Sequence, residues 1–368
     1  MTNALYDSAI NLLQQLIATP SFSKEESNTA TAIEHWLQQH GVITYRYLNN
    51  VWAVNKFYNP ALPTLLLNSH HDTVKPNAGY TIDPFKPIIN DGKLYGLGSN
   101  DAGGCLVSLL ACFVHFYPQG NLPFNLIIAA TAEEEISGAN GIEALLKETT
   151  FTQVTQWQNN TAIYGIVGEP TQMQMAVAER GLMVIDAVAT GKAGHAARQE
   201  GVNALYIAVN DIAWCKAYAF ERVSDFLGPV QTTVTSIHTP NTQHNVVPDT
   251  CSFVIDVRVN ELYHFEEVLT TLQAKMQSVL TPRSTRLKSS MIALDTPLVQ
   301  AGIQLGKQYY GSPTTSDKAL IPFPALKIGP GDSARSHTAN EYIYIHEIEQ
   351  GINEYIALIQ QCANYLSL

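Results

Sequence analysis

The sequence predicts an α/β fold, in which a main domain has a mostly parallel mixed sheet flanked by helices and carries a smaller inserted α+β domain. In the first part of the chain, short apolar runs alternate with helical segments, which is typical of parallel strands covered by helices. Strands of alternating polarity begin near residue 180, and the first pattern returns after about residue 290. We therefore expect a main domain of residues 1–179 and 290–368 and an inserted domain of residues 180–289.

The main domain is expected to begin with helices at 5–18 and 25–39, because apolar residues recur there at helical spacing. Pro20 ends the first of them. The apolar segment CLVSLLACFVHFY indicates a buried helix, and a shorter helix is expected at 139–147. Apolar runs of strand length predict strands at 43–48, 51–57, 64–69, PFNLIIAATA and AIYGIVGEP.

The later helices and strands are predicted from the same spacings of apolar residues. In the inserted domain, the predicted strands are LMVIDAVATG, QTTVTSIHT and CSFVIDVRV, and the predicted helices are 202–219 and 261–280. In the returning part of the main domain, we expect a helix at 297–309, a strand at 325–329 and a closing helix at 346–365.

Composition excludes several classes of function. Apolar residues make up 46% of the 368 residues, which is enough for a large core. The net charge of −11 argues against nucleic acid or an anionic membrane as a partner, because both require a basic face. The N-terminus lacks the basic start of a signal peptide, and the five scattered cysteines form no CxxC, so we expect a cytoplasmic protein without membrane spans.

Polar side chains follow several of the predicted strands. In TLLLNSHHDTV, His70 and Asp72 point to the same face of the strand, as a metal-binding imidazole and its orienting acid would. A solvated strand end is the alternative, and the motif alone does not exclude it. In YGLGSNDAGG, a glycine-rich turn holds Asp101 at a helix start. A phosphate-binding loop is the alternative for this turn, but a carboxylate in the position of the anion favours a cation.

Three adjacent acids, Glu133, Glu134 and Glu135, directly follow the apolar strand of PFNLIIAATA. Ligands bind at the strand ends of α/β sheets, and clustered carboxylates there require a neutralising cation or a proton. A solvated acidic turn before the helix at 139–147 is the alternative. Glu169 in IVGEPT and His337 in GPGDSARSHTANE are individually consistent with an exposed acid and an ordinary loop histidine.

The five candidate motifs taken together are more informative than any one of them. Five loops each supply one imidazole or carboxylate and none supplies a thiolate, which suits zinc, cobalt or manganese in an open catalytic site. Five ligands that include one shared carboxylate fit two metal ions about 3.5–4 Å apart. The five candidate ligands are His70, Asp101, Glu135, Glu169 and His337.

The order of SHHDTV, GLGSNDAGG, TAEEE, VGEPT, GKAGHAA and a late loop histidine resembles the co-catalytic zinc deacylase and exopeptidase family. This family includes acetylornithine deacetylase, succinyl-diaminopimelate desuccinylase, acetylcitrulline deacetylase and glutamate-releasing carboxypeptidases. The resemblance covers nearly the whole chain. It implies that the main domain is a metal-binding catalytic domain and that the inserted domain is a lid through which the protein forms a homodimer.

The resemblance also assigns roles to individual residues. It implies that His70 and Glu135 are terminal ligands of one metal ion, that Glu169 and His337 are terminal ligands of the other, and that Asp101 bridges the two. Two divalent ions, most plausibly zinc, would activate a water molecule and polarise the substrate carbonyl.

Five further roles complete the expected site. Glu134 matches the general base, Asp72 the acid that orients His70, and Glu133 a supporting acid. His195 in GKAGHAAR, at what is predicted to be a helix start, matches an oxyanion donor supplied across a dimer interface; a capping or core histidine is the alternative. Candidates for binding the substrate carboxylate, with surface salt bridges as the alternative, are Arg258, Asn245, Arg335 and Ser333.

The substrate is expected to be a small N-acyl amino acid. In the family, the bridging aspartate is commonly followed by Met-Lys-Gly-Gly, whereas Asp101 is followed by Ala-Gly-Gly. This departure favours N-acetylornithine or N-acetylcitrulline, in arginine biosynthesis, over the desuccinylase reaction. Succinyl-diaminopimelate desuccinylase and a metallo-dipeptidase or carboxypeptidase remain alternatives. A non-catalytic binding protein of the same fold would be expected to lack a ligand or the base, and here every such position is filled.

Overall fold

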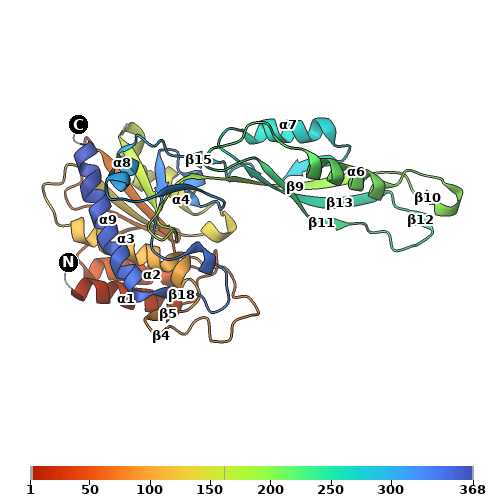
Figure 1. Cartoon of the computed structure of the whole chain (residues 1–368). Coiled ribbons are helices and arrows are strands. Elements are labelled where there is room, and N and C mark those ends of the chain that lie inside the picture. Colours follow the sequence, from red (N-terminus) through yellow and green to blue (C-terminus); the bar gives the residue numbers. More distant parts are fainter. Residues whose placement is uncertain (1–2, 161, 367–368) are drawn as a thin grey trace. The chain divides into compact units, whose positions relative to one another are not determined.

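The computed structural model describes residues 3–160 and 162–366, which form two compact units (Figure 1). Unit 1 comprises Met1–Val177, Ile292–Tyr310 and Ser316–Leu368, and unit 2 comprises Ala178–Met291 and Gly311–Thr315. The sequence pattern gives no sign that Gly311–Thr315 belongs to unit 2. Among the described helices, none is both long and apolar enough to cross a membrane.

A mixed sheet forms the centre of unit 1, with its strands in the order β1-β2-β6-β3-β7-β17-β8-β15, where β15 is Ser290–Met291. The inner strands β6, β3, β7 and β17 are parallel, and the outer strands β1, β2 and β8 pair antiparallel. This confirms the predicted α/β class. The strand bounds are β1 Tyr45–Tyr47, β2 Asn50–Val54, β3 Thr64–His70, β6 Asn125–Thr131, β7 Ile163–Val167, β8 Met175–Glu179, β16 Tyr309–Ser312, which pairs with β8, and β17 Ala325–Lys327.

Helices cover both faces of this sheet. Helix α3 packs against β3, β6, α1 and α9, whereas α4 and α5 pack on the face that includes Leu66. Because successive strand residues alternate between faces, His70 lies on the same face as Leu66. The helix bounds are α1 Asn3–Ile17, α2 Ser27–Gln39, α3 Gly104–Phe116, α4 Ile142–Lys147, α5 Thr149–Thr155, α8 Pro297–Gln304 and α9 Ile345–Leu366.

A small antiparallel sheet, in the order β18-β5-β4, completes unit 1. Its strand β18 begins directly after the loop that carries His337, so this sheet fixes the far end of that loop. The bounds are β4 Ile88–Asn90, β5 Lys93–Tyr95 and β18 Tyr342–Tyr344.

Unit 2 is a four-stranded antiparallel sheet, in the order β11-β13-β9-β14, with α6 and α7 packed on one face. The alternation in LMVIDAVATG has the expected result, because Met183, Ile185, Ala187 and Ala189 are all buried in this core. The bounds are β9 Gly181–Thr190, β10 Gly194–His195, β11 Gln231–His238, β12 Val246–Val247, β13 Thr250–Val259, β14 Val279–Pro282, β15 Ser290–Met291, α6 Ala204–Ala217 and α7 Phe265–Lys275.

Two predicted helices are too long. The helix expected at 261–280 ends at Lys275, because the Asp211 carboxylate accepts hydrogen bonds from the backbone N–H groups of Gln277 and Ser278 at 3.0 and 2.8 Å. The next residues form the strand β14. The helix expected at 297–309 ends at Gln304, shortly before Gly306, whose φ of 76° favours glycine and stops the helix.

Candidate metal centre

The carboxyl ends of neighbouring parallel strands bring the candidate ligands to one edge of the sheet. His70 is the last residue of β3 and lies opposite Thr131, the last residue of β6. The three acids follow β6, and Glu169 follows β7, the other neighbour of β3. The loop with His337 follows β17, which is parallel to β7. The edge therefore collects side chains from four strands that are distant in sequence.

Asp101 lies between the two histidines. The distance from Asp101 Oδ1 to His70 Nε2 is 3.4 Å, and that from Asp101 Oδ2 to His337 Nε2 is 3.6 Å. Each oxygen of this carboxylate therefore faces a different imidazole. This is the geometry required of a carboxylate shared between two cations.

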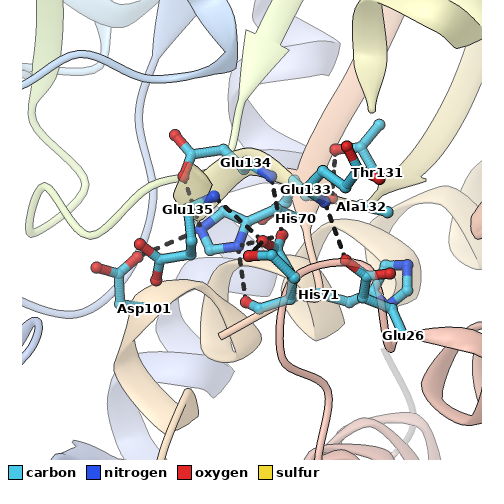
Figure 2. Close-up of polar contacts among 12 residues, drawn as sticks. Glu26, His70, His71, Asp101, Thr131, Ala132, Glu133, Glu134 and Glu135 are labelled. Atoms are coloured by element: carbon cyan, nitrogen blue, oxygen red, sulfur yellow. Dashed lines mark hydrogen bonds and ion pairs between the residues drawn. The ribbon is translucent and has the colours of Figure 1, made fainter. Parts of the chain in front are cut away.

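The other acids surround the same two imidazoles. Glu169 Oε1 and Glu134 Oε2 lie 3.8 and 3.9 Å from His70 Nε2, and Glu135 Oε2 lies 3.0 Å from His337 Nε2. Figure 2 shows the side chains of Glu134 and Glu135 beside His70. The centre is compact, because ligand atoms of His70, Asp101 and Glu135 also lie within 4.8 Å of one another.

The closest contacts between histidines and glutamates pair the ligands differently from the grouping that the resemblance implied. Glu135 was expected to share a cation with His70, and Glu169 with His337, but the shortest contacts pair His70 with Glu169 and His337 with Glu135. The reason is local. Glu169 follows the strand adjacent to β3, whereas the turn after β6 carries Glu135 toward the His337 loop. The order of the motifs along the chain does not indicate which glutamate lies next to which histidine.

The Nε2 atom of His70 is buried and makes no hydrogen bond within the described part of the chain. The other ring nitrogen, Nδ1, lies 3.0 Å from the backbone carbonyl oxygen of Asp72 and donates to it, so Nε2 remains to face a cation. The surrounding carboxylates require positive charge. Burial lowers the pKa of His70, but the nearby carboxylates of Asp101, Asp72 and the other acids outweigh it and raise this pKa well above its ordinary value. A divalent ion would satisfy the same demand.

The carboxylate of Asp72 holds the acidic turn as well as His70. Its two oxygens accept hydrogen bonds from the backbone N–H groups of Glu134 and Glu135, both at 3.1 Å. The hydroxyl of Ser23 donates to it at 2.6 Å. Its Oδ1 lies 3.4 Å from His70 Nδ1, farther than the Asp72 carbonyl oxygen. Asp72 therefore orients His70 mainly through its backbone and positions the acids through its side chain.

Glu133 has a different role from its two neighbours. Its φ of 58° turns the chain sharply after β6, and its carboxylate accepts a hydrogen bond from the Asn140 side chain at 2.8 Å. Buried Glu26 accepts from the backbone N–H of Glu133 at 3.3 Å (Figure 2). The acid triplet thus divides into one residue that forms the turn and two that face the imidazoles. The sequence pattern did not indicate Glu26, which lies before α2.

His71 and Asp317 support the strand ends from behind. His71 donates from Nε2 to the Asn49 carbonyl oxygen at 2.9 Å, and burial lowers its pKa to about 4, so the ring is neutral. Buried Asp317 accepts hydrogen bonds from Asn68 at 3.0 Å and Thr131 at 2.8 Å, which ties β3 to β6 next to the site. Nothing in the sequence around Asp317 signalled this.

Two arginines expected to bind substrate are already paired with acids. Arg335 makes two hydrogen bonds to Glu347, at 2.7 and 3.0 Å, and its guanidinium stacks on Tyr342 and Tyr344. In unit 2, Arg258 makes two hydrogen bonds to Asp256, at 2.8 and 3.0 Å. The contacts of Arg335 match the salt bridge that was the alternative to a substrate role, and they anchor the His337 loop.

The other predicted residues are distributed between the units. Ser333 begins a single helical turn in the His337 loop. His195 ends the short strand β10, which pairs with β12 next to Asn245. It is also the N-cap of the short 3-10 turn Ala196–Arg198, so it does lie at the start of a helical turn, as predicted. The exposed His195 ring accepts a hydrogen bond from the backbone N–H of Ala197 at 3.2 Å.

We predict that Arg335→Ala lowers the free energy of unfolding by about 1–3 kcal/mol, because a two-pronged charged hydrogen bond is lost. Glu347→Gln leaves the arginine in place and should cost a similar amount, and the double variant should cost less than the sum. Urea unfolding measures all three. A normal stability of Arg335→Ala combined with a tenfold higher KM, absent in Glu347→Gln, would restore the substrate role.

Comparison with known proteins gives one family and a consistent set of relatives. Residues 66–361 match the model of peptidase family M20/M25/M40, which covers most of the chain. A succinyl-diaminopimelate desuccinylase of Wolbachia pipientis subsp. Culex pipiens is 25% identical over 370 residues, which are 93% of this chain and 90% of the relative. Succinyl-diaminopimelate desuccinylase 2 of Ruegeria sp. is 26% identical over 278 residues, which are 71% and 67% of the two chains.

Solved structures share the fold. Aminopeptidase PepT from Bacillus cereus has a TM-score of 0.75 at 19% identity, with 97% of this chain and 99% of that chain covered. A dinuclear metal binding peptidase of the M20 family from Bacillus subtilis has a TM-score of 0.71 at 15% identity, with 100% and 99% covered. The chain therefore belongs to peptidase family M20/M25/M40 and is a metal-dependent hydrolase that acts on amides.

Proposed function

We propose that the protein removes an acyl group from a small N-acyl amino acid at a centre that binds two divalent cations. The placement of Asp101 between the imidazoles of His70 and His337 carries this proposal. Within the described part of the chain, the buried Nε2 of His70 makes no hydrogen bond, which also fits a metal ligand. His70, Glu169 and Asp101 would hold one cation, and His337, Glu135 and Asp101 the other. These nitrogen and oxygen donors suit zinc first, with cobalt or manganese as alternatives.

When bound, the two cations supply a water molecule of lowered pKa and polarise the amide carbonyl. The protein contributes the proton transfers. The backbone N–H of Glu134 is held by Asp72, and its carboxylate lies 3.9 Å from His70 Nε2, beside the proposed cation site, where a base is needed. It accepts a proton as the carbonyl is attacked and donates it to the leaving amine. Burial and the nearby charges of Glu169, Asp317 and Glu135 raise the pKa of Glu134, which helps it hold that proton.

The proposal extends to the identity of the acyl group and the amino acid in the substrate. The names of the relatives favour N-succinyl-diaminopimelate and a place in lysine biosynthesis. N-acetylornithine or N-acetylcitrulline, in arginine biosynthesis, is the second candidate, because Asp101 is followed by Ala-Gly-Gly without a lysine. Arg258, Asn245 and Ser333 remain candidates for contacts with the substrate. We further propose a cytoplasmic location.

A substrate panel tests this proposal. The zinc-reconstituted protein would be assayed with N-succinyl-diaminopimelate, N-acetylornithine, N-acetylcitrulline and simple dipeptides. The highest kcat/KM is expected for the succinyl substrate. A tenfold preference for an acetylated substrate would select the second candidate. Cleavage of dipeptides alone would overturn the deacylase proposal in favour of a dipeptidase.

We also propose that unit 2 forms a homodimer and that His195 of the partner subunit stabilises the oxyanion. On α6, Tyr206 is 67% and Val209 48% exposed, and the edge strand β11 exposes Ile237. A second copy of unit 2 would cover these apolar side chains and pair with the edge strand.

Complementation tests this arrangement. His195→Ala and Glu134→Gln should each be nearly inactive, but mixed dimers contain one complete site. Random exchange makes half of the dimers mixed, so the mixture should recover about a quarter of wild-type activity. Tyr206→Glu should give monomers by sedimentation and abolish the recovery, whereas Val279→Glu, on the opposite edge strand β14, is the control. A fully active monomer would contradict the shared site.

A further inference from the structure

The glycine-rich turn around Asp101 surrounds a carboxylate of the chain itself. The side chain of Glu341 accepts hydrogen bonds from the backbone N–H groups of Gly98 at 3.2 Å, Asn100 at 2.8 Å and Asp101 at 2.9 Å. The backbone carbonyl oxygen of Glu341 accepts a fourth bond, from the N–H of Gly96 at 3.0 Å. One residue thus satisfies four backbone donors of one short turn.

The turn is shaped for this carboxylate. Gly98 has a φ of 74°, which favours glycine, and this conformation aims successive N–H groups inward. Glu341 is only 2% exposed, so its interaction with these donors is weakly screened. The Asp101 N–H points to Glu341, while the Asp101 carboxylate points to the two histidines. The backbone and the side chain of Asp101 are therefore fixed from opposite directions.

Glu341 also belongs to the loop that carries His337. Asn340, its neighbour, accepts hydrogen bonds from the N–H groups of Thr81 and Ile82 at 3.0 and 3.3 Å. The carbonyl oxygen of His337 accepts from the Asn77 side chain at 3.1 Å. Residues 77–82 thus hold the loop at two points, and Glu341 connects it directly to the turn that carries Asp101.

We infer that Glu341 is a positioning residue that joins the Asp101 turn to the His337 loop, so that the shared carboxylate is preorganised between the two imidazoles. The inference rests on the proposed function, because it concerns the same cation centre. Removing a residue that orients a metal ligand typically lowers metal affinity or activity about 10–100-fold. The loss should fall on kcat and on cation affinity more than on KM, because Glu341 is buried behind Asp101.

The test uses Glu341→Gln and Glu341→Ala in the full chain, with Glu143→Gln, from the surface pair with Lys147, as a control. In Glu341→Gln, the side-chain oxygen can still accept the two hydrogen bonds that Oε1 accepts from Asn100 and Asp101. The NH2 group takes the place of Oε2 and cannot accept the hydrogen bond from the N–H of Gly98. Calorimetric titration of the metal-free protein with Zn²⁺ should show affinity decreasing from wild type to Gln to Ala. Amide hydrogen exchange should rise selectively in the peptide that covers residues 96–101, while urea unfolding changes less.

The outcomes are separable. If Glu341→Ala does not fold, the isosteric Gln variant decides the question. Wild-type Zn²⁺ affinity, kcat and amide exchange in the Gln variant would overturn the inference, and so would a loss of protection spread over all of unit 1. If the wild-type protein binds no Zn²⁺, the proposed function fails, and the exchange experiment on the metal-free protein still shows whether Glu341 holds the turn.

Discussion

Glu134→Gln is expected to keep the wild-type metal content and to lower kcat by about 10²–10⁴-fold, the usual contribution of a positioned acid–base group. The substitution preserves the shape of the side chain and the backbone hydrogen bond to Asp72. It removes the ability to accept a proton. Steady-state kinetics on the best substrate of the panel and elemental analysis of the same preparation measure the two quantities together.

The two neighbouring acids provide matched controls. Glu135→Gln removes an oxygen next to His337 and should weaken cation binding by at least about 10–100-fold. Glu133→Gln disturbs the bond to Asn140 and should mainly cost about 1–3 kcal/mol of stability. Substitution of Glu134, Glu135 and Glu133 is thus expected to impair turnover, metal binding and folding stability, respectively. A near-normal kcat for the Glu134 variant would refute its role as the base.

The parts of the fold that follow from local patterns were predictable. The alternation that buries Ile185 and the helical period of CLVSLLACFVHFY each depend on a single element, so the sequence alone indicates them. The strand ends after β3, β6 and β7 were predictable as ligand positions, because parallel neighbours end at one edge. The end of α7 was not, because a distant carboxylate, Asp211, competes for the backbone there. The end of α8 has a local signal in Gly306, which the predicted helix at 297–309 overran.

Pairings between distant residues account for most of what the sequence could not reveal. Arg335 was a candidate for binding substrate, with a surface salt bridge as the alternative, and only the fold shows that it lies against Glu347 and two tyrosines. The grouping of Glu169 with His70 likewise depends on the strand order. Glu341 belongs to the quoted GPGDSARSHTANE motif, yet its function requires knowing that the Asp101 turn lies against it. The type of a residue indicates that it can be a ligand, whereas the contacts between loops determine which other residues it binds.

Asp101 is expected to be the most sensitive position for metal binding. Asp101→Ala removes both oxygens that lie between the imidazoles, so the protein should hold less than one tightly bound divalent ion per chain. Its kcat/KM should fall by more than about 10³-fold, because the cation chemistry is lost with the ions. Elemental analysis after dialysis and calorimetry with Zn²⁺ provide the measurements.

Asp101→Asn makes this prediction more specific. The amide keeps one oxygen and places an NH2 group toward the other imidazole, so one cation position should survive with reduced affinity while the second is lost. Asp83→Asn, at an exposed carboxylate of the same unit, should leave both positions intact. If Asp101→Asn still binds two ions with wild-type affinity, the carboxylate is not shared. The centre would then have to be assigned to the contacts of His70 with Glu169 and of His337 with Glu135 as two independent sites.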